Sequence, residues 1–192
     1  MSPADRVRRA LDEVATLAHR VAAEHADAVA DVADRYTACL RAGGTLFFAG
    51  NGGSAADAQH IATEYVVRYE VARPALRAVA LTTDTSVLTA GANDLGFAEV
   101  FARQVEALAR PGDVLVIHST SGESPNVLAA ARAAKARGVG VVAFLGKSGG
   151  PLRDLADAAI VVPSSHTARI QEMHLALEHV ICELVEARME GR

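Results

Sequence analysis

Short runs of mostly apolar residues alternate with stretches of helical periodicity along the chain after residue 44. Such runs, bounded by glycine and polar residues, predict strands buried on both faces, as in a parallel sheet. The predicted strands are residues 45–50, 76–81, 113–118, 139–146 and 158–163, and the predicted helices are about 54–69, 85–92, 97–109, 124–137, 150–156 and 167–190. The alternation predicts an α/β fold: a doubly wound, five-stranded parallel sheet flanked by helices.

The first 43 residues are predicted to form a helical pair ahead of the sheet. The sequence SPAD at 2–5 has the features of a helix start: a hydroxyl cap, a proline and an acidic residue in the first turn. Apolar residues recur at helical spacing from 7 to 21, and a second helix is predicted from about 26 to 41, ending at a glycine pair. Because these apolar stripes need cover, residues 1–43 are expected to pack at an oligomer interface.

Composition narrows the class of protein. The 192 residues fit a single domain, 1–192, and the 4% aromatic content favours close-packed helices over a β-sandwich. The net charge of −4 argues against nucleic acid or an anionic membrane as a partner. No apolar run approaches the roughly 20 residues of a membrane span, and the charged start is unlike a secretory signal. A cytoplasmic protein is therefore expected, with Cys39 and Cys182 reduced in its core.

Two of the predicted strands lead into loops of similar chemistry. Strand 45–50 runs into Asn51-Gly52-Gly53-Ser54, and strand 113–118 runs into a loop with four hydroxyls, Ser119, Thr120, Ser121 and Ser124. The backbone N–H groups at the start of a helix favour a phosphate, and the carboxyl ends of parallel strands meet at one edge of a sheet. The two loops together predict one pocket for a small phosphorylated molecule.

The two loops also allow simpler interpretations. Residues 50–55 fit a relaxed dinucleotide motif, GxGxxA, but no acidic residue ends the next strand and no GxxxxGK[ST] occurs, so a nucleotide is not expected. The glycines could serve only a tight turn, and the hydroxyls only helix capping. Capping needs one hydroxyl, however, and this loop has four within six residues.

Two helices carry further polar clusters in apolar surroundings. His60 and Glu64 are four residues apart and share one face, a spacing that suits either a pair of metal ligands or an acid/base pair. In the last helix, Gln171 and Glu178 share a face, and His179 lies about 80° around the axis from Gln171 and ~12 Å along it. His174 is predicted to be an exposed or capped polar residue of this helix. Asn93-Asp94 is predicted to be a turn, or else a contact to substrate hydroxyls.

Four segments in order resemble the SIS-domain phosphoheptose isomerase family: GNGGSAADAQHIATEY, AGANDLGF, STSGESPNV and RIQEMHLALEH. The resemblance runs from about residue 44 to the end of the chain. It implies an aldose–ketose isomerase that converts sedoheptulose 7-phosphate to D-glycero-D-manno-heptose 7-phosphate, in nucleotide-activated heptose biosynthesis. It also implies a homotetramer with one zinc ion per subunit and active sites at subunit interfaces.

The resemblance also implies roles for particular residues. The zinc ligands would be His60, Glu64, Gln171 and His179. The residues in contact with substrate would be Asn51, Gly52, Gly53, Ser54, Glu64, Asn93, Asp94, Ser119, Thr120, Ser121, Ser124 and Gln171. Aldose–ketose isomerisation needs a base, a proton donor and positive charge near the developing oxyanion. Glu64 in its apolar setting is the candidate base, and His179 is the candidate partner acid and base.

The sequence departs from the family pattern at three positions. Glu123 stands where many relatives have Asn, His118 where an aliphatic residue is common, and Ala168 where some members have an acidic residue. These departures bear on the particular sugar rather than on the isomerase class. The chain could act on another long-chain sugar phosphate, such as an octose phosphate.

Proteins of other classes share the SIS fold. One relative is a non-catalytic protein that binds a replication initiator; it lacks the equivalents of Glu64 and His179, which are both present here. Sugar-phosphate-sensing regulators usually carry an added DNA-binding domain, and the lyase-type relatives are longer. Metal identity also stays open, because His, Glu and Gln side chains bind several divalent ions.

Overall fold

The strands of the computed structural model form one parallel sheet in the order β2-β1-β3-β4-β5. The model describes residues 1–191. The elements are α1 (Pro3–Arg41), β1 (Leu46–Gly50), α2 (Gly53–Val66), β2 (Ala78–Ala80), α3 (Thr85–Asp94), the 3-10 turn η1 (Phe97–Glu99), α4 (Val100–Leu108), β3 (Val114–Ser119), α5 (Pro125–Ala136), β4 (Gly140–Gly146), α6 (Gly150–Leu155), β5 (Ala158–Val162) and α7 (Thr167–Met189). The predicted five-stranded, doubly wound α/β fold is confirmed.

The chain reverses its direction of travel across the sheet at β1. β2 pairs with one edge of β1, and β3 pairs with the other. Ligands of open α/β sheets bind at such a switch point, beyond the carboxyl ends of the strands. The register aligns Gly50 with His118, so the loops that follow β1 and β3 start side by side.

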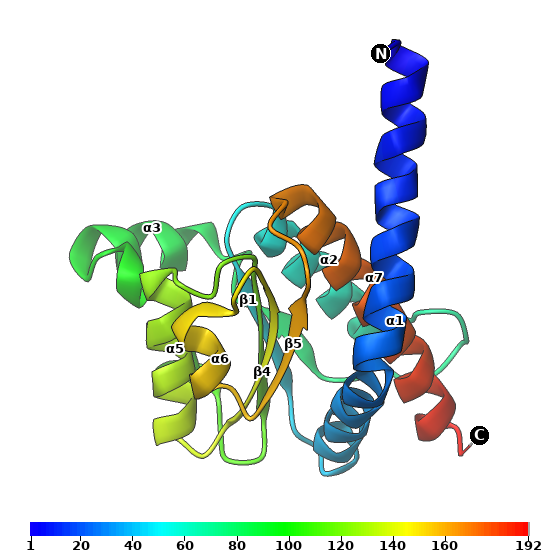
Figure 1. The fold of residues 1–192 in the computed structure, drawn as a ribbon. Helices are drawn as coiled ribbons and strands as arrows, with labels where there is room; N and C mark the ends of the chain where they lie inside the picture. The colour runs from blue at the N-terminus through cyan, green and yellow to red at the C-terminus, as the bar shows by residue number, and fades with distance from the viewer. Residues whose placement is uncertain (192) are drawn as a thin grey trace.

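Residues 1–43 do not form the predicted helical pair; that prediction is wrong. One helix, α1, runs for 39 residues from a capping box in which Ser2 Oγ accepts from the Asp5 N–H at 3.1 Å. The predicted break around residues 22–25 contains Ala, Ala, Glu and His, and no glycine or proline stops the helix there. Its first half projects away from the sheet (Figure 1), and Val7 and Leu11 are 59% and 64% exposed.

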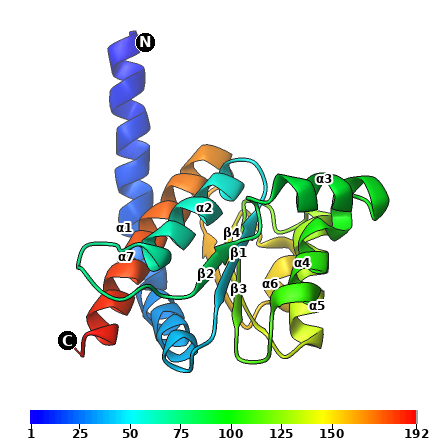
Figure 2. The ribbon, with the colours of Figure 1, turned by 180° about the vertical axis from the view of Figure 1, so that it is seen from behind.

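Helices cover both faces of the sheet. α1, α2 and α7 lie on one face and α3 to α6 on the other, as the two opposite views show (Figures 1 and 2). Alternate residues of each strand face the two layers: Phe48 belongs to the α1–α2–α7 core and Phe47 to the other. The first core contains both cysteines, which are buried and free, as predicted.

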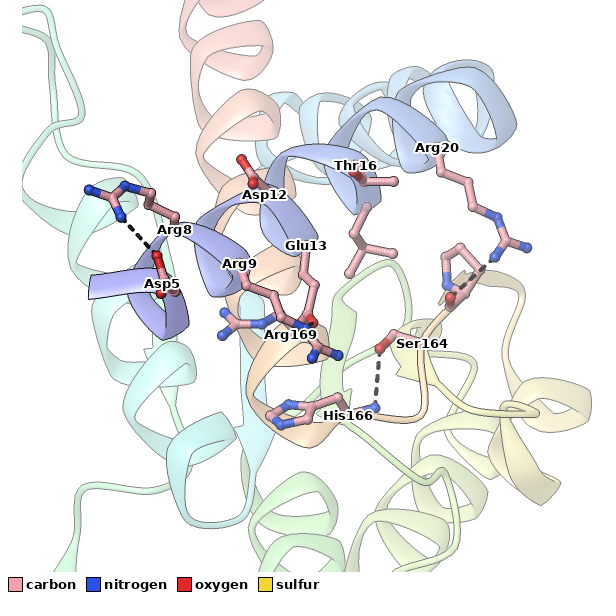
Figure 3. A pocket seen from close by; sticks show the side chains of 12 residues that line it. Asp5, Arg8, Arg9, Asp12, Glu13, Thr16, Arg20, Ser164, His166 and Arg169 are labelled. Carbon is pink, nitrogen blue, oxygen red and sulfur yellow. Dashed lines mark hydrogen bonds and ion pairs between the residues drawn. The ribbon is translucent and has the colours of Figure 1, made fainter. Parts of the chain in front are cut away.

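A cavity of about 650 Å³ lies along the projecting half of α1 (Figure 3). Its walls are α1 and the turn between β5 and α7. The arginines of its lining are paired with carboxylates: Arg8 with Asp5, Arg9 with Glu13, Arg20 with Glu24 and Arg169 with Glu172. Because these charges are neutralised, the cavity is a poor phosphate site.

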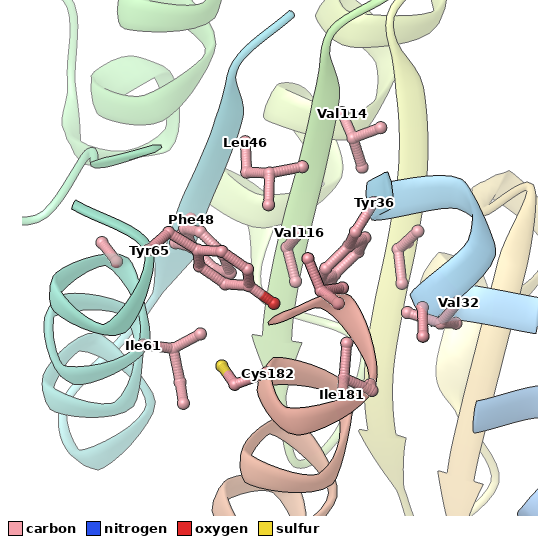
Figure 4. Packing of buried hydrophobic residues seen from close by; sticks show 14 of the residues in the cluster. Val32, Tyr36, Leu46, Phe48, Ile61, Tyr65, Val114, Val116, Ile181 and Cys182 are labelled. Atoms are coloured by element: carbon pink, nitrogen blue, oxygen red, sulfur yellow. The ribbon is translucent and has the colours of Figure 1, made fainter. Parts of the chain in front are cut away.

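The aromatic part of the core lies between α1, α2, α7 and the sheet (Figure 4). Tyr36, Phe48 and Tyr65 are each at most 1% exposed, and their ring centroids lie 5.9–6.4 Å apart. Aromatic rings prefer such edge and offset contacts. This packing holds Tyr65 in the last turn of α2, and so helps to fix the helix that carries His60 and Glu64.

Some predicted boundaries move by a few residues. α2 ends at Val66 rather than near 69, β2 is reduced to three residues, and the helix predicted from 97 begins as a 3-10 turn. Asn93-Asp94 is not a separate turn: both residues lie in the last turn of α3, whose start is capped by Asp84. Within residues 1–191, no helix is both long enough and apolar enough for a membrane span.

Candidate active site

The loops that follow β1 and β3 line one pocket of about 310 Å³ at the carboxyl edge of the sheet. This confirms the prediction that the two loops share a pocket. The lining consists of Asn51, Gly52, Gly53, Ser54, His118, Ser119, Thr120, Ser121, Ser124, Thr167 and Gln171. Three elements therefore meet there: the start of α2, the hydroxyl-rich loop before α5, and the start of α7.

Close approach of the backbone explains two of the glycines. A Cβ on Gly53 would come within 2.6 Å of Gln171 Nε2, so a larger residue would displace the Gln171 amide from its place over the start of α2. Gly122 has φ +68, and a Cβ there would collide with the carbonyl oxygen of Gly149. In the described chain, no side chain caps the amino end of α2, and the N–H groups of residues 54–56 donate to the carbonyls of Asn51 and Gly52, so the N–H groups of Gly52 and Gly53 are those left for a ligand.

The hydroxyls of the second loop have different uses. Ser119 Oγ accepts from the Gly122 N–H at 3.0 Å, and Ser121 Oγ accepts from the Glu123 N–H at 3.2 Å. Ser124 is the N-cap residue of α5, yet in the described chain its side chain makes no capping hydrogen bond. Helix capping therefore does not account for Ser124, and its hydroxyl is available to a ligand.

A pair of asparagines, Asn51 and Asn126, joins the two loops. Asn126 was not predicted to be a site residue. Asn51 Nδ2 donates to Asn126 Oδ1 at 2.9 Å, and Asn126 Nδ2 donates back to Asn51 Oδ1 at 2.8 Å. Asn126 is 2% exposed. A buried amide in the first turn of α5 was the available signal, because an asparagine is costly there without a partner. Thr167 was also missed.

A second group of polar side chains gathers between α2 and α7. His60 Nε2 lies 3.0 Å from His179 Nε2 and 3.3 Å from Glu64 Oε1. The ring of His179 stacks on Tyr69 with centroids 5.7 Å apart. The fold thus brings together three of the four residues expected to bind metal. His179 comes from a position 119 residues after His60 along the chain.

The donor atoms of this group suit a divalent metal. His60, Glu64 and His179 each offer one ligand atom, and these atoms all lie within 4.8 Å of one another. The measured separations of 3.0 and 3.3 Å are near the roughly 3.3 Å between donors of a tetrahedral zinc with bonds of about 2.0–2.1 Å. Among the described residues, no other group of His, Cys, Asp and Glu donors gathers in this way. Imidazole and carboxylate ligands are those of catalytic zinc sites.

Gln171 and the pair Asn93-Asp94 are placed differently from the other predicted site residues. Gln171 lines the loop pocket beside Gly53, two turns before His179 on the same helix. Asn93 and Asp94 hydrogen-bond to each other at 2.7 Å on α3, and they are not part of the pocket lining. A single chain therefore does not bring Asn93 and Asp94 to the loops. Of the departures from the family pattern, Glu123 is exposed and His118 is buried at the pocket floor.

His174 is fully buried and lies in the middle of α7, so the prediction of an exposed or capped residue is wrong. Its Nε2 lies 3.0 Å from the carbonyl oxygen of Leu145, which gives the ring a partner inside the core. Burial, together with the nearby His118, lowers the pKa of His174 to about 3. The ring is therefore neutral near pH 7, and its N–H donates to the carbonyl.

Comparison with known proteins identifies the class and then the family. Residues 11–146 match the family model described as SIS domain, which with the parallel sheet defines an SIS-domain protein. The chain is 56% identical over 164 residues to the phosphoheptose isomerase of Burkholderia pseudomallei, covering 85% of this chain and 83% of the relative. It is 51% identical over 189 residues to that of Roseiflexus sp., covering 96% of both. The chain belongs to the phosphoheptose isomerase family.

A solved structure agrees with this assignment. The phosphoheptose isomerase of Neisseria gonorrhoeae superposes with a TM-score of 0.92 at 41% identity, over 97% of this chain and 100% of that one. The projecting α1 and α7 are included in this coverage. The whole chain, and not only the sheet, therefore has the architecture of the family.

Proposed function

We propose that this chain is an aldose–ketose isomerase that converts sedoheptulose 7-phosphate to D-glycero-D-manno-heptose 7-phosphate, a step of nucleotide-activated heptose biosynthesis in the cytoplasm. The observation that carries the proposal is the contact of His60, Glu64 and His179, on the two helices whose amino ends line the hydroxyl-rich pocket, in a chain of the phosphoheptose isomerase family. A non-catalytic binding protein would not need these three side chains together.

The loop pocket would hold the phosphate and part of the sugar chain. The amino end of α2 presents the N–H groups of Gly52 and Gly53, and Ser124 adds a hydroxyl that makes no capping bond in the described chain. Phosphate oxygens bind strongly to such donors. Holding the phosphate fixes the far end of a linear sugar, so its carbonyl end is directed along α2 and α7 toward His60 and His179.

The reaction moves a proton between two neighbouring carbons. Glu64 accepts the proton from C1 of the ketose, the electrons of that C–H bond form the C1–C2 double bond, and the C2 carbonyl oxygen takes a proton from His179. His179 then accepts the hydroxyl proton at C1, and Glu64 returns its proton to C2, which gives the aldose. His60 lies next to both side chains, and would share the metal with them.

Zinc is the metal that the donors His60, Glu64 and His179 would hold, with Gln171 as the proposed fourth ligand. When bound, it supplies positive charge that stabilises negative charge on the oxygens at C1 and C2. Glu64 is one-fifth exposed and lies among apolar residues of α2, so little water competes for its carboxylate.

The proposed assembly is a homotetramer with active sites between subunits. The exposed Val7 and Leu11 on the projecting half of α1 and the cavity beside it offer a surface for another copy. The side chain of His60 is 47% exposed, so its site is open on one side. A neighbouring subunit would cover that side, and α3 of a neighbour would supply Asn93 and Asp94.

The experiment is an assay of the purified, zinc-loaded protein with sedoheptulose 7-phosphate, with the aldose product followed by NMR. The account predicts formation of D-glycero-D-manno-heptose 7-phosphate, with sedoheptulose, which has no phosphate, as a poor substrate. An octose or pentose phosphate assayed in parallel tests the particular sugar. Absence of any aldose product from zinc-loaded protein would overturn the proposed function.

A further inference from the structure

Two buried polar contacts join α7 to the sheet, one helical turn apart. His174 Nε2 lies 3.0 Å from the carbonyl oxygen of Leu145 in β4, and Glu178 Oε1 lies 3.1 Å from His118 Nε2 in β3. His174 and Glu178 are 0% exposed, and His118 is 1% exposed. The mechanism proposed above uses none of these three side chains.

The surroundings of His118 leave it little freedom. Its ring stacks between Phe144, at a centroid distance of 5.4 Å, and Phe48, at 6.4 Å. The hydroxyl of Tyr36 on α1 also donates to Glu178 Oε1, at 3.3 Å. Glu178 therefore joins α7 to both β3 and α1, in the middle of an otherwise apolar layer.

These contacts differ from the apolar packing around them because they are directional. A helix that packs only through apolar side chains can turn about its axis at little cost, whereas a buried polar group that loses its partner is strongly disfavoured. Within residues 1–191, His118 Nδ1, His174 Nδ1 and Glu178 Oε2 already have no partner. The existing contacts are thus the groups' only polar contacts in the described chain.

The rotation of α7 decides where its other polar residues lie. Gln171 is seven residues before Glu178, so the two share one face, and His179 follows Glu178 by about 100° around the helix. Gln171 lies against Gly53 at the pocket, and His179 meets His60. Turning α7 would move both side chains from these places at once.

We propose that His118, His174 and Glu178 are positioning residues: their contacts set the rotation of α7, and so place His179 against His60 and Gln171 over Gly53. The three do not form a metal centre of their own, since among the described residues only His60, Glu64 and His179 bring their donors together. The catalytic consequence rests on the proposed function, while the placement itself does not.

The decisive variant replaces the His118–Glu178 contact by apolar packing, in the double variant His118→Leu/Glu178→Met. Because the buried Tyr36 hydroxyl would otherwise lose its acceptor, the double variant and its reference protein both carry Tyr36→Phe. Exchanging a buried polar pair for apolar residues of similar size usually preserves stability, so the melting temperature should stay near that of this reference. Positioning would nevertheless be lost. We expect zinc affinity, measured by calorimetry, to fall about tenfold, as it does when an outer-shell partner is removed, and kcat to fall with it.

Two further variants separate positioning from folding. His118→Gln keeps an N–H that can donate to Glu178, so it should retain zinc affinity and kcat, whereas His118→Leu alone should lose stability as well. His25→Gln is the matched control, because His25 on α1 also contacts a backbone carbonyl, but that of Val161 in β5, at 3.0 Å, and not a residue of α7. It should leave zinc affinity unchanged.

A crystal structure of the double variant completes the test and does not depend on zinc or activity. The proposal predicts that the 3.0 Å contact of His60 with His179 opens. A double variant that keeps this contact, the zinc affinity and kcat of the wild type would overturn positioning. If wild-type protein shows no isomerase activity but the contact still opens in the variant, the proposed function fails and positioning stands.

Discussion

At the scale of single residues, a polar side chain of the candidate site can bind a ligand only where no other group of the protein already occupies it. His60 and Glu64 were predictable because their spacing puts them on one face of a helix, whatever the rest of the fold does. The burial of His174 was not predictable, because it depends on a partner in a distant strand. That partner, the carbonyl of Leu145, is 29 residues away in sequence.

Glu64→Gln tests the proposed base. Glutamine keeps the shape of the side chain but cannot accept the proton from C1, so kcat should fall by about 10³-fold, within the usual range for loss of a general base. The fold should be unchanged by circular dichroism. Glu106→Gln, an exposed residue paired with Arg103 on α4, is the matched control. Near-normal kcat in Glu64→Gln would assign the base elsewhere.

Ser121→Ala combined with Ser124→Ala tests the phosphate pocket. Hydrogen bonds to a charged phosphate contribute about 1.5–3 kcal/mol each, so KM for the phosphorylated sugar should rise tenfold or more. Ser165→Ala, at an exposed residue outside the pocket lining, should not change KM. An unchanged KM in the double variant would place the phosphate in another part of the protein.

At the scale of elements, the site depends on how α2, α7 and the loop between α2 and β2 are held together. Glu186 on α7 accepts from the backbone N–H groups of Tyr69, Glu70 and Val71 at 2.9–3.1 Å, and from Arg73 Nε at 3.0 Å. Arg73 in turn donates to the carbonyl oxygen of Glu64 at 2.6 Å. This network fixes the loop that stacks Tyr69 on His179.

The network was not predictable from the sequence, because a salt bridge between a loop and a helix 113 residues away leaves no periodic signal. The strands and most helices were predictable, since each is a local pattern of apolar residues. The break expected within α1 was wrong. The apolar stripe is interrupted there, but the residues between its two parts are mostly good helix formers, so the helix continues.

Glu186→Gln should lower the free energy of unfolding by about 2 kcal/mol at pH 7, because it removes the charge that holds four donors. Burial disfavours the charged form of Glu186, but the backbone hydrogen bonds and Arg73 outweigh it and lower the pKa. Its stabilisation is therefore complete above the unfolded-state pKa, near 4.3, and is lost as pH falls through the lower folded-state pKa.

Urea unfolding at a series of pH values measures this effect. The difference between wild type and Glu186→Gln should be constant near neutral pH and shrink below about pH 4. Glu183→Gln, an exposed residue on the same helix, should differ little from wild type at any pH. A Glu186→Gln deficit that persists unchanged into acid would contradict the role of the charge.

At the scale of the whole molecule, the predicted site residues of one chain do not all lie together. The carboxyl edge of the sheet supplies the pocket, but His60 is half exposed and Asn93 and Asp94 lie outside the pocket lining. The parallel sheet could be predicted from the strand pattern, because buried apolar runs alternating with helices have few other solutions. Assembly depends on surfaces of several elements at once, which a single sequence does not order in space.

Val7→Asp/Leu11→Asp tests the proposed assembly. Two charges on the exposed apolar stripe of α1 would be buried without partners in an interface, so the tetramer should dissociate. Sedimentation should give four times the 20.0 kDa of the chain for wild type and a smaller mass for the variant. Leu108→Asp, at a residue 52% exposed on α4, is the control and should sediment as wild type does.

Activity measured on the same samples shows whether the site depends on assembly. The account predicts that the dissociated variant loses turnover although each chain keeps its fold. A wild-type protein that sediments as a monomer and is fully active would contradict intersubunit active sites.

The most direct test of the central claim is the transfer of solvent deuterium into the sugar. In D2O, zinc-loaded wild type acting on sedoheptulose 7-phosphate should give aldose with deuterium at C2, and recovered ketose with deuterium at C1, because the proton passes through Glu64. Glu64→Gln should give neither. Deuterium incorporation that survives in Glu64→Gln, or none in wild type over prolonged incubation, would contradict isomerisation by these residues.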